Sequence, residues 1–134
     1  MKIIIVGAGA VGTHLAKLLS REHQDCVLID ADEERLAKMS EYDVMTYCAS
    51  PTSIKALKEA GTHNADLFVG VTPEESLNIN ACILAHALGA KKTVARIDNY
   101  EYLAPSLQPF FKNLGLDSLI YPEVLAAIDI NNGL

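Results

Sequence analysis

Residues 2–12 read Lys-Ile-Ile-Ile-Val-Gly-Ala-Gly-Ala-Val-Gly, an apolar run that leads directly into a Gly-x-Gly-x-x-Gly motif. The apolar run predicts a buried β-strand, and the residues after it predict a helix with an apolar stripe at Val11, Leu15, Leu18 and Leu19. A strand, a glycine-rich turn and a helix in this order are typical of a dinucleotide-binding βαβ unit.

The three glycines have different expected roles in this turn. Gly7 allows a tight turn out of the strand, and Gly9 leaves room for a pyrophosphate to approach the backbone. Gly12 allows the helix to pack closely on the strand. Because the helix begins near Ala10, its free N–H groups and positive dipole end are expected to bind the phosphates without a basic side chain.

A second apolar run, residues 26–30, ends in a carboxylate about twenty residues after the glycines. This carboxylate, Asp30, is expected to accept both hydroxyls of an adenosine ribose. Its charge would repel a 2′-phosphate, which favours NAD(H) over NADP(H), although Arg35 offsets that repulsion in part. The alternative role of Asp30 is a helix cap, but Asp32 suits that role better because two glutamates follow it.

Composition limits the class of protein. The 134 residues, half of them hydrophobic, fit one nucleotide-binding domain over residues 1–134. The net charge of −6 disfavours a nucleic-acid partner or an anionic membrane surface. The apolar runs are too short to span a bilayer, and the first strand follows Met1 and Lys2 directly. We therefore expect no signal peptide, no membrane insertion and a cytoplasmic location.

The cysteines do not indicate a disulfide framework or a metal site. Cys26, Cys48 and Cys82 are odd in number, widely spaced and set among apolar or small residues, which predicts reduced thiols in the core. Cys82 and His86 lie one helical turn apart, but two ligands without a second pair do not define a metal site. We predict no metal and no catalytic residue.

Strand-like and helix-like segments alternate along the chain. Strands are expected at residues 2–6, 26–30, 44–47, 66–71, 93–97 and 118–121, with helices of about ten residues between them. Ser50 and Pro51 are expected to begin one helix, Gly61 and Gly89 to end two, and Pro122 to begin the last. This alternation predicts an α/β, Rossmann-like doubly wound parallel sheet of six strands, in the order 3-2-1-4-5-6, with helices on both faces.

In such a sheet a ligand binds at the carboxyl ends of the first and fourth strands, where the strand order reverses. Ser50 and Thr72 follow the third and fourth strands there and can donate to ligand oxygens. For Ser50 a helix-cap role can coexist with ligand contact, whereas for Thr72 the cap is an alternative to it. Arg96 lies in an otherwise apolar strand, so its guanidinium is expected to point either to the edge of the sheet or to an anion. The anion is either a phosphate or one of three acids, Asp66, Glu74 or Glu75.

Six segments carry a resemblance to a known family: GAGAVGTHLAKLL (7–19), LID (28–30), CASPTSIKALKEAG (48–61), AD (65–66), VGVTPEESLNINAC (69–82) and ARIDNYEYL (95–103). In these segments the chain resembles the RCK/KTN (TrkA-N) family of nucleotide-binding domains, and within it the regulators of Trk-type potassium uptake. The resemblance implies a non-enzymatic regulatory subunit that binds NAD(H), with ADP, ATP and AMP as further candidates. It also implies that ring conformation gates a membrane potassium transporter, with the protein peripheral at the inner face of the membrane.

The motif and the resemblance together predict a nucleotide site. Its residues are Gly7, Ala8, Gly9, Ala10, Val11, Gly12, Asp30, Ala31, Cys48, Ala49, Ser50, Val71, Thr72, Asn78 and Arg96. Asn78 is included only through the resemblance. Ala10 stands where some relatives carry an arginine directed at a terminal phosphate, and this difference disfavours ATP.

Relatives continue into a further subdomain, so the chain is expected to be part of a longer protein in which residues 122–134 begin a crossover, dimerisation helix. Val124, Leu125 and Ile128 share one side of that helix, and Phe110 and Phe111 are expected to extend the apolar patch. The resemblance implies a homodimer and a higher ring in the full-length protein. The alternative is that these side chains fold back on the sheet.

The main functional alternative is an NAD-dependent oxidoreductase without its substrate domain, because this fold carries many activities. No His, Cys or Tyr-x-x-x-Lys is placed to act as an acid or base over a nicotinamide. A scaffold that binds coenzyme A would share the glycines but not the ARIDNYEYL segment.

Overall fold

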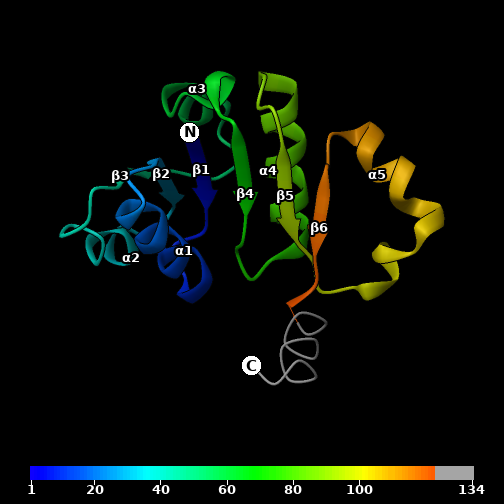
Figure 1. The fold of residues 1–134 in the computed structure, drawn as a ribbon, viewed down its shortest axis with the longest axis horizontal. Coiled ribbons are helices and arrows are strands. Elements are labelled where there is room, and N and C mark those ends of the chain that lie inside the picture. Colours follow the sequence, from blue (N-terminus) through cyan, green and yellow to red (C-terminus); the bar gives the residue numbers. More distant parts are fainter. Residues whose placement is uncertain (123–134) are drawn as a thin grey trace.

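The computed structural model describes residues 1–122, which form one parallel six-stranded sheet with helices on both faces (Figure 1). The strand order is β3-β2-β1-β4-β5-β6, as the sequence predicts. The strands are β1 (Lys2–Val6), β2 (Asp25–Asp30), β3 (Met45–Cys48), β4 (Leu67–Gly70), β5 (Thr93–Arg96) and β6 (Ser118–Ile120). The expected crossover helix of residues 122–134, with Val124, Leu125 and Ile128, lies outside the described residues except for Pro122.

The central strand β1 pairs with β2 on one side and β4 on the other. Ile3, Ile4, Ile5 and Val6 are all buried, because helices cover both faces of this strand. A continuous apolar run is therefore stable here, whereas a strand with one wet face would alternate apolar and polar residues. Because β1 and β4 are parallel neighbours, their carboxyl ends lie beside each other. The strand order reverses between these two strands, which is where ligands bind in sheets of this kind.

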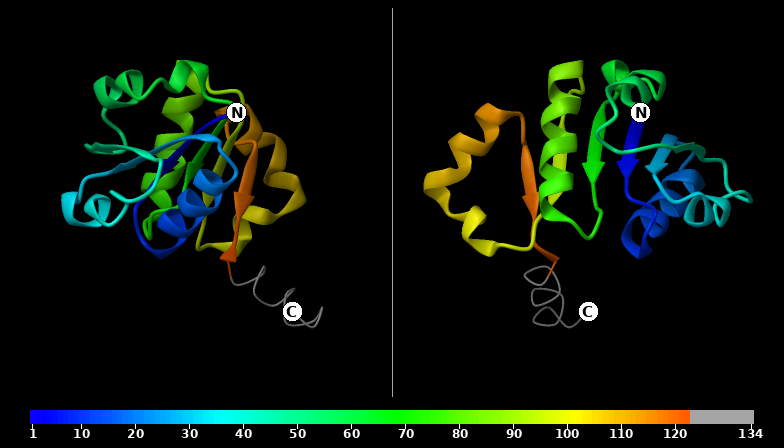
Figure 2. Two further views of the ribbon diagram at one scale, coloured as in Figure 1. Left: turned by 60° about the vertical axis from the view of Figure 1, so that its left-hand side comes forward. Right: turned by 180° about the vertical axis from the view of Figure 1, so that it is seen from behind.

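Two hydrophobic cores lie on the two faces of the sheet. The helices α1 (Ala10–Arg21) and α2 (Glu33–Ala37) cover one face, where Ala16 and Leu36 pack. The helices α3 (Ile54–Glu59), α4 (Glu75–Leu88) and α5 (Gln108–Leu114) contribute to the other core through Leu57, Ala81 and Phe111. Figure 2 shows α4 lying against β5 from behind. Three short 3₁₀ turns complete the described chain: η1 (Thr62–Asn64), η2 (Tyr100–Leu103) and η3 (Pro105–Leu107).

Several helices differ from the expected ones. The helices α2, α3 and α5 have only 5, 6 and 7 residues. The expected start of α3 at Ser50 and Pro51 is wrong, because the Ser53 hydroxyl accepts a hydrogen bond from the Ala56 N–H and caps the helix. The expected ends are confirmed at Gly61 and Gly89, which follow α3 and α4 with φ of 83° and 113°.

The predicted apolar stripe of α1 is wrong in part. Val11 and Leu18 are exposed, and the residues that α1 buries are Gly12 and Ala16. Small residues face the sheet because the glycine turn brings the start of α1 very close to β1, which leaves no room for long side chains. Leu15 and Leu19 lie half-buried at the margin of the core.

Two of the three cysteines are core thiols, as expected, but Cys48 is exposed. Burial raises the pKa of the Cys26 thiol to about 11 and that of the Cys82 thiol to about 12. The thiol of Cys48, at the end of the edge strand β3, donates to the Ala31 carbonyl across 3.4 Å. The prediction that Cys48 is a core thiol is wrong because β3 is an edge strand, and fewer elements cover an edge strand than a central one.

Candidate functional site

The glycine turn after β1 has a backbone conformation that only glycine adopts readily. Gly7 has a φ of 110°, and its N–H donates to the Ile29 carbonyl across 2.9 Å. A Cβ on Gly7 would lie 2.9 Å from the Thr72 nitrogen, so the loop after β4 packs directly against this turn. The turn therefore fixes two loops at once.

The other two glycines have opposite surroundings. A Cβ on Gly12 would lie 1.6 Å from the Gly7 carbonyl oxygen, whereas a Cβ on Gly9 would meet no atom within 4 Å. Gly12 thus sets the close approach of α1 to the turn, and Gly9 borders open space. No side chain caps the start of α1, so the first N–H groups of the helix have neither an intrahelical acceptor nor a capping side chain.

Asp30 holds the glycine turn and the end of β2 together. Its Oδ2 accepts a hydrogen bond from the Ala8 N–H, and its Oδ1 accepts one from the Asp32 N–H, each across 2.7 Å. Each oxygen has a second acceptor position, so the carboxylate can still accept one hydrogen bond on each atom. Asp32, as expected, caps α2 by accepting from the N–H groups of Glu34 and Arg35.

A cavity of about 270 Å³ opens beside these groups at the carboxyl ends of the strands. The residues that line it are Gly7, Gly9, Asp30, Ala31, Arg35, Pro51, Thr72, Pro73, Glu74 and Leu77. Five of the predicted site residues are among them, and they come from the loops after β1, β2 and β4. In Figure 1 the arrowheads of β1 and β4 point to this edge of the sheet.

The remaining predicted residues do not line this cavity. Ala8 and Val71 are buried behind the loops, and Ala10 and Val11 are exposed on the first turn of α1. Beyond the glycine turn, the segment after β3 is held to β2, because the Ala49 N–H donates to the Asp30 carbonyl across 3.0 Å.

Neither Ser50 nor Thr72 caps a helix, although each was a candidate cap. Pro51 reaches the cavity, while the neighbouring Ser50 is exposed and accepts a hydrogen bond from the Thr52 N–H. Thr72 does not cap α4, because Glu74 occupies the cap position. The Thr72 hydroxyl instead accepts from the Glu74 N–H and lies 2.7 Å from the Asn78 Oδ1.

Sequence reasoning gave Arg35 only a minor role, but its guanidinium lies at the cavity. It is 3.9 Å from Asp30 Oδ2 and 3.5 Å from Asp32 Oδ2. Because the Arg35 side chain is half-exposed, these pairs contribute little to stability. Their effect is to keep a cation beside the Asp30 carboxylate. The signal in the sequence is the spacing of three from Asp32, which places the two side chains on one face of α2.

Arg96, at the end of β5, forms no ion pair with any of residues 1–122. Two of the three acids proposed as its partners, Asp66 and Glu75, are otherwise engaged, and Glu74 forms no ion pair with any of residues 1–122. Asp66 accepts from the Lys2 N–H and pairs with Lys91 at 3.1 Å, and these two contacts, the backbone one first, lower the pKa of its carboxyl. Glu75 accepts two backbone N–H groups. The guanidinium of Arg96 is thus available to an anion.

Asn78 is fully buried. Its Oδ1 accepts from the Thr72 N–H across 2.8 Å, and its Nδ2 donates to the carbonyls of Thr72 and Arg96 across 2.9 and 3.0 Å. The amide is therefore used within the protein and has no accessible atom for a ligand. The sequence could not show this, because these partners lie on two different strands.

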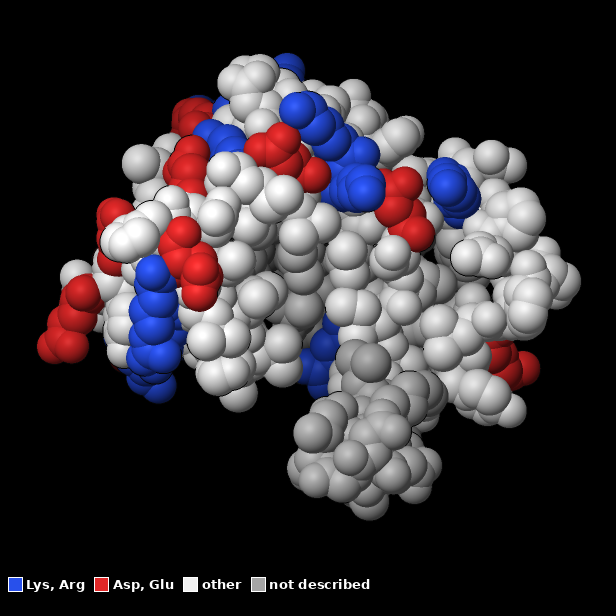
Figure 3. Space-filling model, viewed as in Figure 1, with Lys and Arg blue, Asp and Glu red and all other residues white. Residues whose placement is uncertain are grey.

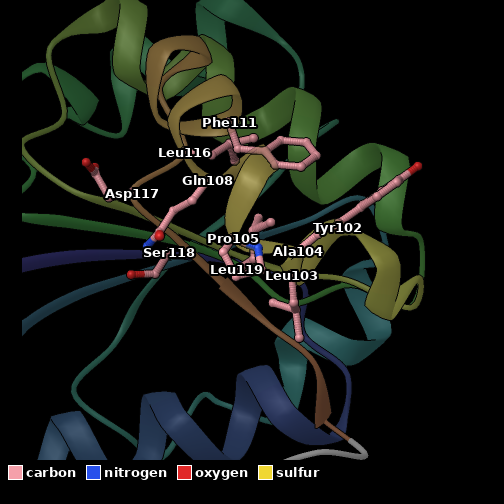
Figure 4. Close-up of a pocket in the computed structure, with 10 residues that line it drawn as sticks. All are labelled: Tyr102, Leu103, Ala104, Pro105, Gln108, Phe111, Leu116, Asp117, Ser118 and Leu119. Atoms are coloured by element: carbon pink, nitrogen blue, oxygen red, sulfur yellow. The ribbon is translucent and has the colours of Figure 1, made fainter.

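A second cavity, of about 260 Å³, lies beside the edge strand β6, between η2, α5 and β6. Figure 4 shows that the polar ends of Tyr102, Asp117 and Ser118 point away from the middle of the group. The Asp117 carboxylate accepts a hydrogen bond from the Thr93 N–H across 2.9 Å. None of the predicted site residues lines this cavity. The cavity at the glycine turn is the better candidate because it combines backbone donors with a carboxylate.

Charge is distributed unevenly over the surface. In Figure 3 charged side chains gather at the amino ends of the strands and over α1 and α2, while the surface over η2, η3 and α5 is largely uncharged. Basic atoms also lie recessed in the hollow at the carboxyl ends of the central strands. Within residues 1–122, no helix combines the length and apolar character needed to cross a bilayer.

Known proteins resemble this chain in sequence, and solved structures resemble it in fold. The chain is 41% identical over 133 residues to the Trk system potassium uptake protein TrkA of Haemophilus influenzae, and 37% identical over 129 residues to a TrkA homolog of Archaeoglobus fulgidus. These alignments cover 97% and 95% of the chain but only 29% of each relative. The chain thus spans less than a third of the length of these two relatives.

Solved structures have the same fold at low sequence identity. The TrkA-N domain of the inner membrane protein ybaL from Escherichia coli superposes with a TM-score of 0.84 at 17% identity, over 99% of this chain and 96% of that one. The GsuK channel bound to NAD superposes with a TM-score of 0.71 at 16% identity, over 89% of this chain and 21% of that one. The TrkA-N domain family itself matches residues 3–122. The chain therefore belongs to the TrkA-N domain family.

Proposed function

We propose that this chain is the nucleotide-binding domain of a regulatory subunit in a potassium uptake system, and that it binds NAD(H). ADP, ATP and AMP are competing ligands of the same site, and NADP(H) is disfavoured by the Asp30 carboxylate. Nucleotide occupancy would act on a membrane potassium transporter through the conformation of a ring of subunits. The protein would then be cytoplasmic and peripheral at the inner face of the membrane.

One observation carries the nucleotide assignment. The Asp30 carboxylate keeps an acceptor position on each oxygen while both oxygens are fixed by the Ala8 and Asp32 N–H groups, and it borders the same cavity as Gly9. A ribose presents two neighbouring hydroxyl donors, and a pyrophosphate needs the uncapped N–H groups of α1. The two halves of an adenosine diphosphate group match these two features.

The comparisons support the transport role. Two relatives above 30% identity are named as Trk potassium uptake proteins, and a solved channel with the same fold is bound to NAD. Because those relatives are much longer than this chain, the role in transport and the choice of nucleotide remain our proposal for it. Arg96, without an acidic partner in residues 1–122, is the side chain we propose for the phosphates.

Calorimetric titration of the chain with NAD⁺, NADH, ADP and ATP tests the binding proposal. We expect a saturable heat with NAD⁺ or NADH at 1:1 stoichiometry, because one cavity at the glycine turn carries the ribose and phosphate groups. NADPH should bind more weakly, since its 2′-phosphate would meet Asp30. If none of these nucleotides binds at millimolar concentration, the proposal fails.

We expect no hydride transfer by this chain. The cavity at the glycine turn is lined by no histidine, cysteine, lysine or tyrosine that could serve as a proton donor. Incubated with NADH and a panel of aldehydes and ketones, the chain should cause no loss of absorbance at 340 nm. A sustained loss that depends on protein concentration would instead support the oxidoreductase alternative.

We propose that the chain self-associates as a homodimer. The expected apolar face at Leu125 and Ile128 lies outside the described residues. Of the two phenylalanines expected to extend this patch, only one is exposed. Phe111 is buried in the core, while Phe110 is 55% exposed. An exposed patch that is identical on two copies is covered when a two-fold interface closes.

Light scattering at micromolar concentration should therefore give the mass of a dimer. The triple substitution of Phe110, Leu125 and Ile128 by Asp should reduce it to that of a monomer, because a charge at each position disfavours burial. Replacing the exposed Lys55 by Asp changes charge without removing an apolar group, and it should leave the dimer intact. A monomeric wild type would contradict the interface.

A further inference from the structure

The first turn of α4 joins two loops that follow different strands. Asn78 binds the loop after β4 at Thr72, through both the N–H and the carbonyl, and binds the end of β5 at the Arg96 carbonyl. α4 packs closely on β4 at this point, because a Cβ on Gly70 would lie 3.1 Å from the Asn78 Cα. Asn78 therefore fixes Thr72 and Arg96 relative to the sheet and to each other.

Glu75, three residues earlier on α4, makes the second connection. Its Oε1 accepts hydrogen bonds from two consecutive backbone N–H groups, those of Asp98 and Asn99, each across 2.9 Å. Hydrogen bonds to an ionised acceptor are about twice as strong as neutral ones. Since Asp98 and Asn99 follow Arg96 closely in the chain, Glu75 holds the loop after β5 to the same helix turn that holds Thr72.

These connections lead to the groups expected at the phosphates. Thr72 packs against the glycine turn, as the 2.9 Å approach of a Gly7 Cβ to its nitrogen shows. Arg96 has an available guanidinium and a backbone held from both sides, by Asn78 at its own carbonyl and by Glu75 two and three residues later. Asp30, in contrast, is fixed by the Ala8 and Asp32 N–H groups, which come from the loops after β1 and β2 and not from α4.

We propose that Glu75 and Asn78 are positioning residues, which hold the loops after β4 and β5 in the arrangement that binds the phosphates of a nucleotide without touching it. The proposal rests on the nucleotide binding proposed above. It separates the site into an adenosine half set by Asp30 and a phosphate half set by α4. We call Glu75 and Asn78 together the clamp. A substitution in the clamp should therefore weaken the binding of ligands that carry phosphate more than the binding of ligands that lack it.

The test compares ADP with adenosine as probes of the two halves, by calorimetry and by NMR titration of the folded chain. Glu75→Ala should weaken ADP binding about tenfold, since the loss of hydrogen bonds to a charged acceptor costs about 1.5 kcal/mol. Adenosine affinity should stay within about twofold of wild type. Glu75→Gln should recover most of the ADP affinity, because its amide oxygen can still accept from both N–H groups.

Charge alone predicts a different result. Removing a carboxylate near phosphate would tighten ADP binding in both Glu75 variants, so tighter or unchanged binding in Glu75→Ala overturns the proposal. Glu101→Gln is the charge-matched control, because Glu101 is exposed on the neighbouring η2 and its carboxylate forms no hydrogen bond or ion pair with residues 1–122. Equal losses for ADP and adenosine would also overturn it, because they indicate a general structural defect.

Asn78→Asp provides a second variant. It keeps the Oδ1 acceptor for Thr72 but places an oxygen against the carbonyls of Thr72 and Arg96, so ADP binding should fall more than in Glu75→Ala. Thermal melting of each variant shows whether it is folded at the titration temperature. If Asn78→Asp is unfolded at that temperature, the result for Glu75→Ala alone decides the proposal. If the wild type binds none of ADP, ATP, NAD⁺ and NADH, the proposed function itself is refuted, whereas wild-type ADP binding that is unaffected in Glu75→Ala refutes only the role of Glu75 and Asn78.

Discussion

Gly12→Ala should unfold this domain or leave it only marginally stable. The added Cβ would lie 1.6 Å from the Gly7 carbonyl oxygen and 2.8 Å from its carbonyl carbon, and these are backbone atoms that cannot rotate away. Either α1 moves off β1, or the glycine turn loses its conformation. We expect a loss of about 3 kcal/mol or more in the free energy of unfolding, at the upper end of the usual cost of overpacking. The midpoint of thermal unfolding should fall by roughly 10 °C or more.

Gly9→Ala is the matched control, because it adds the same methyl group three residues earlier. That methyl would meet no atom within 4 Å, so the midpoint of unfolding should change by only a few degrees. In the proposed function, however, the open space at Gly9 is where the pyrophosphate approaches the backbone. Gly9→Ala should thus fold normally and bind nucleotide poorly, while Gly12→Ala should fail at folding. Two variants of equal stability, measured by urea denaturation, would contradict this division of roles.

Asp30→Ala should abolish nucleotide binding at concentrations that saturate the wild type. The substitution removes the acceptors for both ribose hydroxyls, and hydrogen bonds to a charged group contribute about 1.5 to 3 kcal/mol each. The expected loss is about 100-fold or more in affinity, measured by calorimetry with NAD⁺. Equal affinities for wild type and variant would show that the ribose is bound elsewhere.

Two controls accompany this variant. Asp30→Ala also leaves the Ala8 and Asp32 N–H groups without their acceptor, so its stability must be measured beside its affinity. Asp43→Ala removes an equal charge from an exposed side chain that makes no hydrogen bond within the described part of the chain, and it should bind NAD⁺ as the wild type does. The comparison separates a general charge effect from the loss of a specific acceptor.

Strong local signals explain why so much of the architecture could be predicted. The strand order, the parallel sheet and the central position of β1 follow from apolar runs that alternate with helical segments, and the structure confirms them. Boundaries were less predictable because several side chains compete to cap the same turn. Ser50 and Ser53 lie three residues apart, and in the structure Ser53 caps α3 while Leu57 of the same helix packs in the core.

The predicted site divides in the same way. The glycines and Asp30 were identifiable because each acts through local backbone geometry, which the sequence encodes directly. The role of Glu75 was not, since it depends on which loops the sheet brings together. Asn78 was assigned to the ligand through a resemblance, and the structure shows that its amide is used by Thr72 and Arg96.

The sequence by itself determined the fold class of this protein, the turn at Gly7 and the carboxylate at the end of β2, because these depend on short-range patterns and on backbone conformation. Only the tertiary structure decided which polar groups remain free for a ligand. Arg96 has no acidic partner in residues 1–122, whereas Asn78 is fully satisfied, and both facts arise from contacts between β4, β5 and α4. Such contacts join residues up to 24 positions apart, as in the bond from the Asn99 N–H to Glu75, and no local pattern records them.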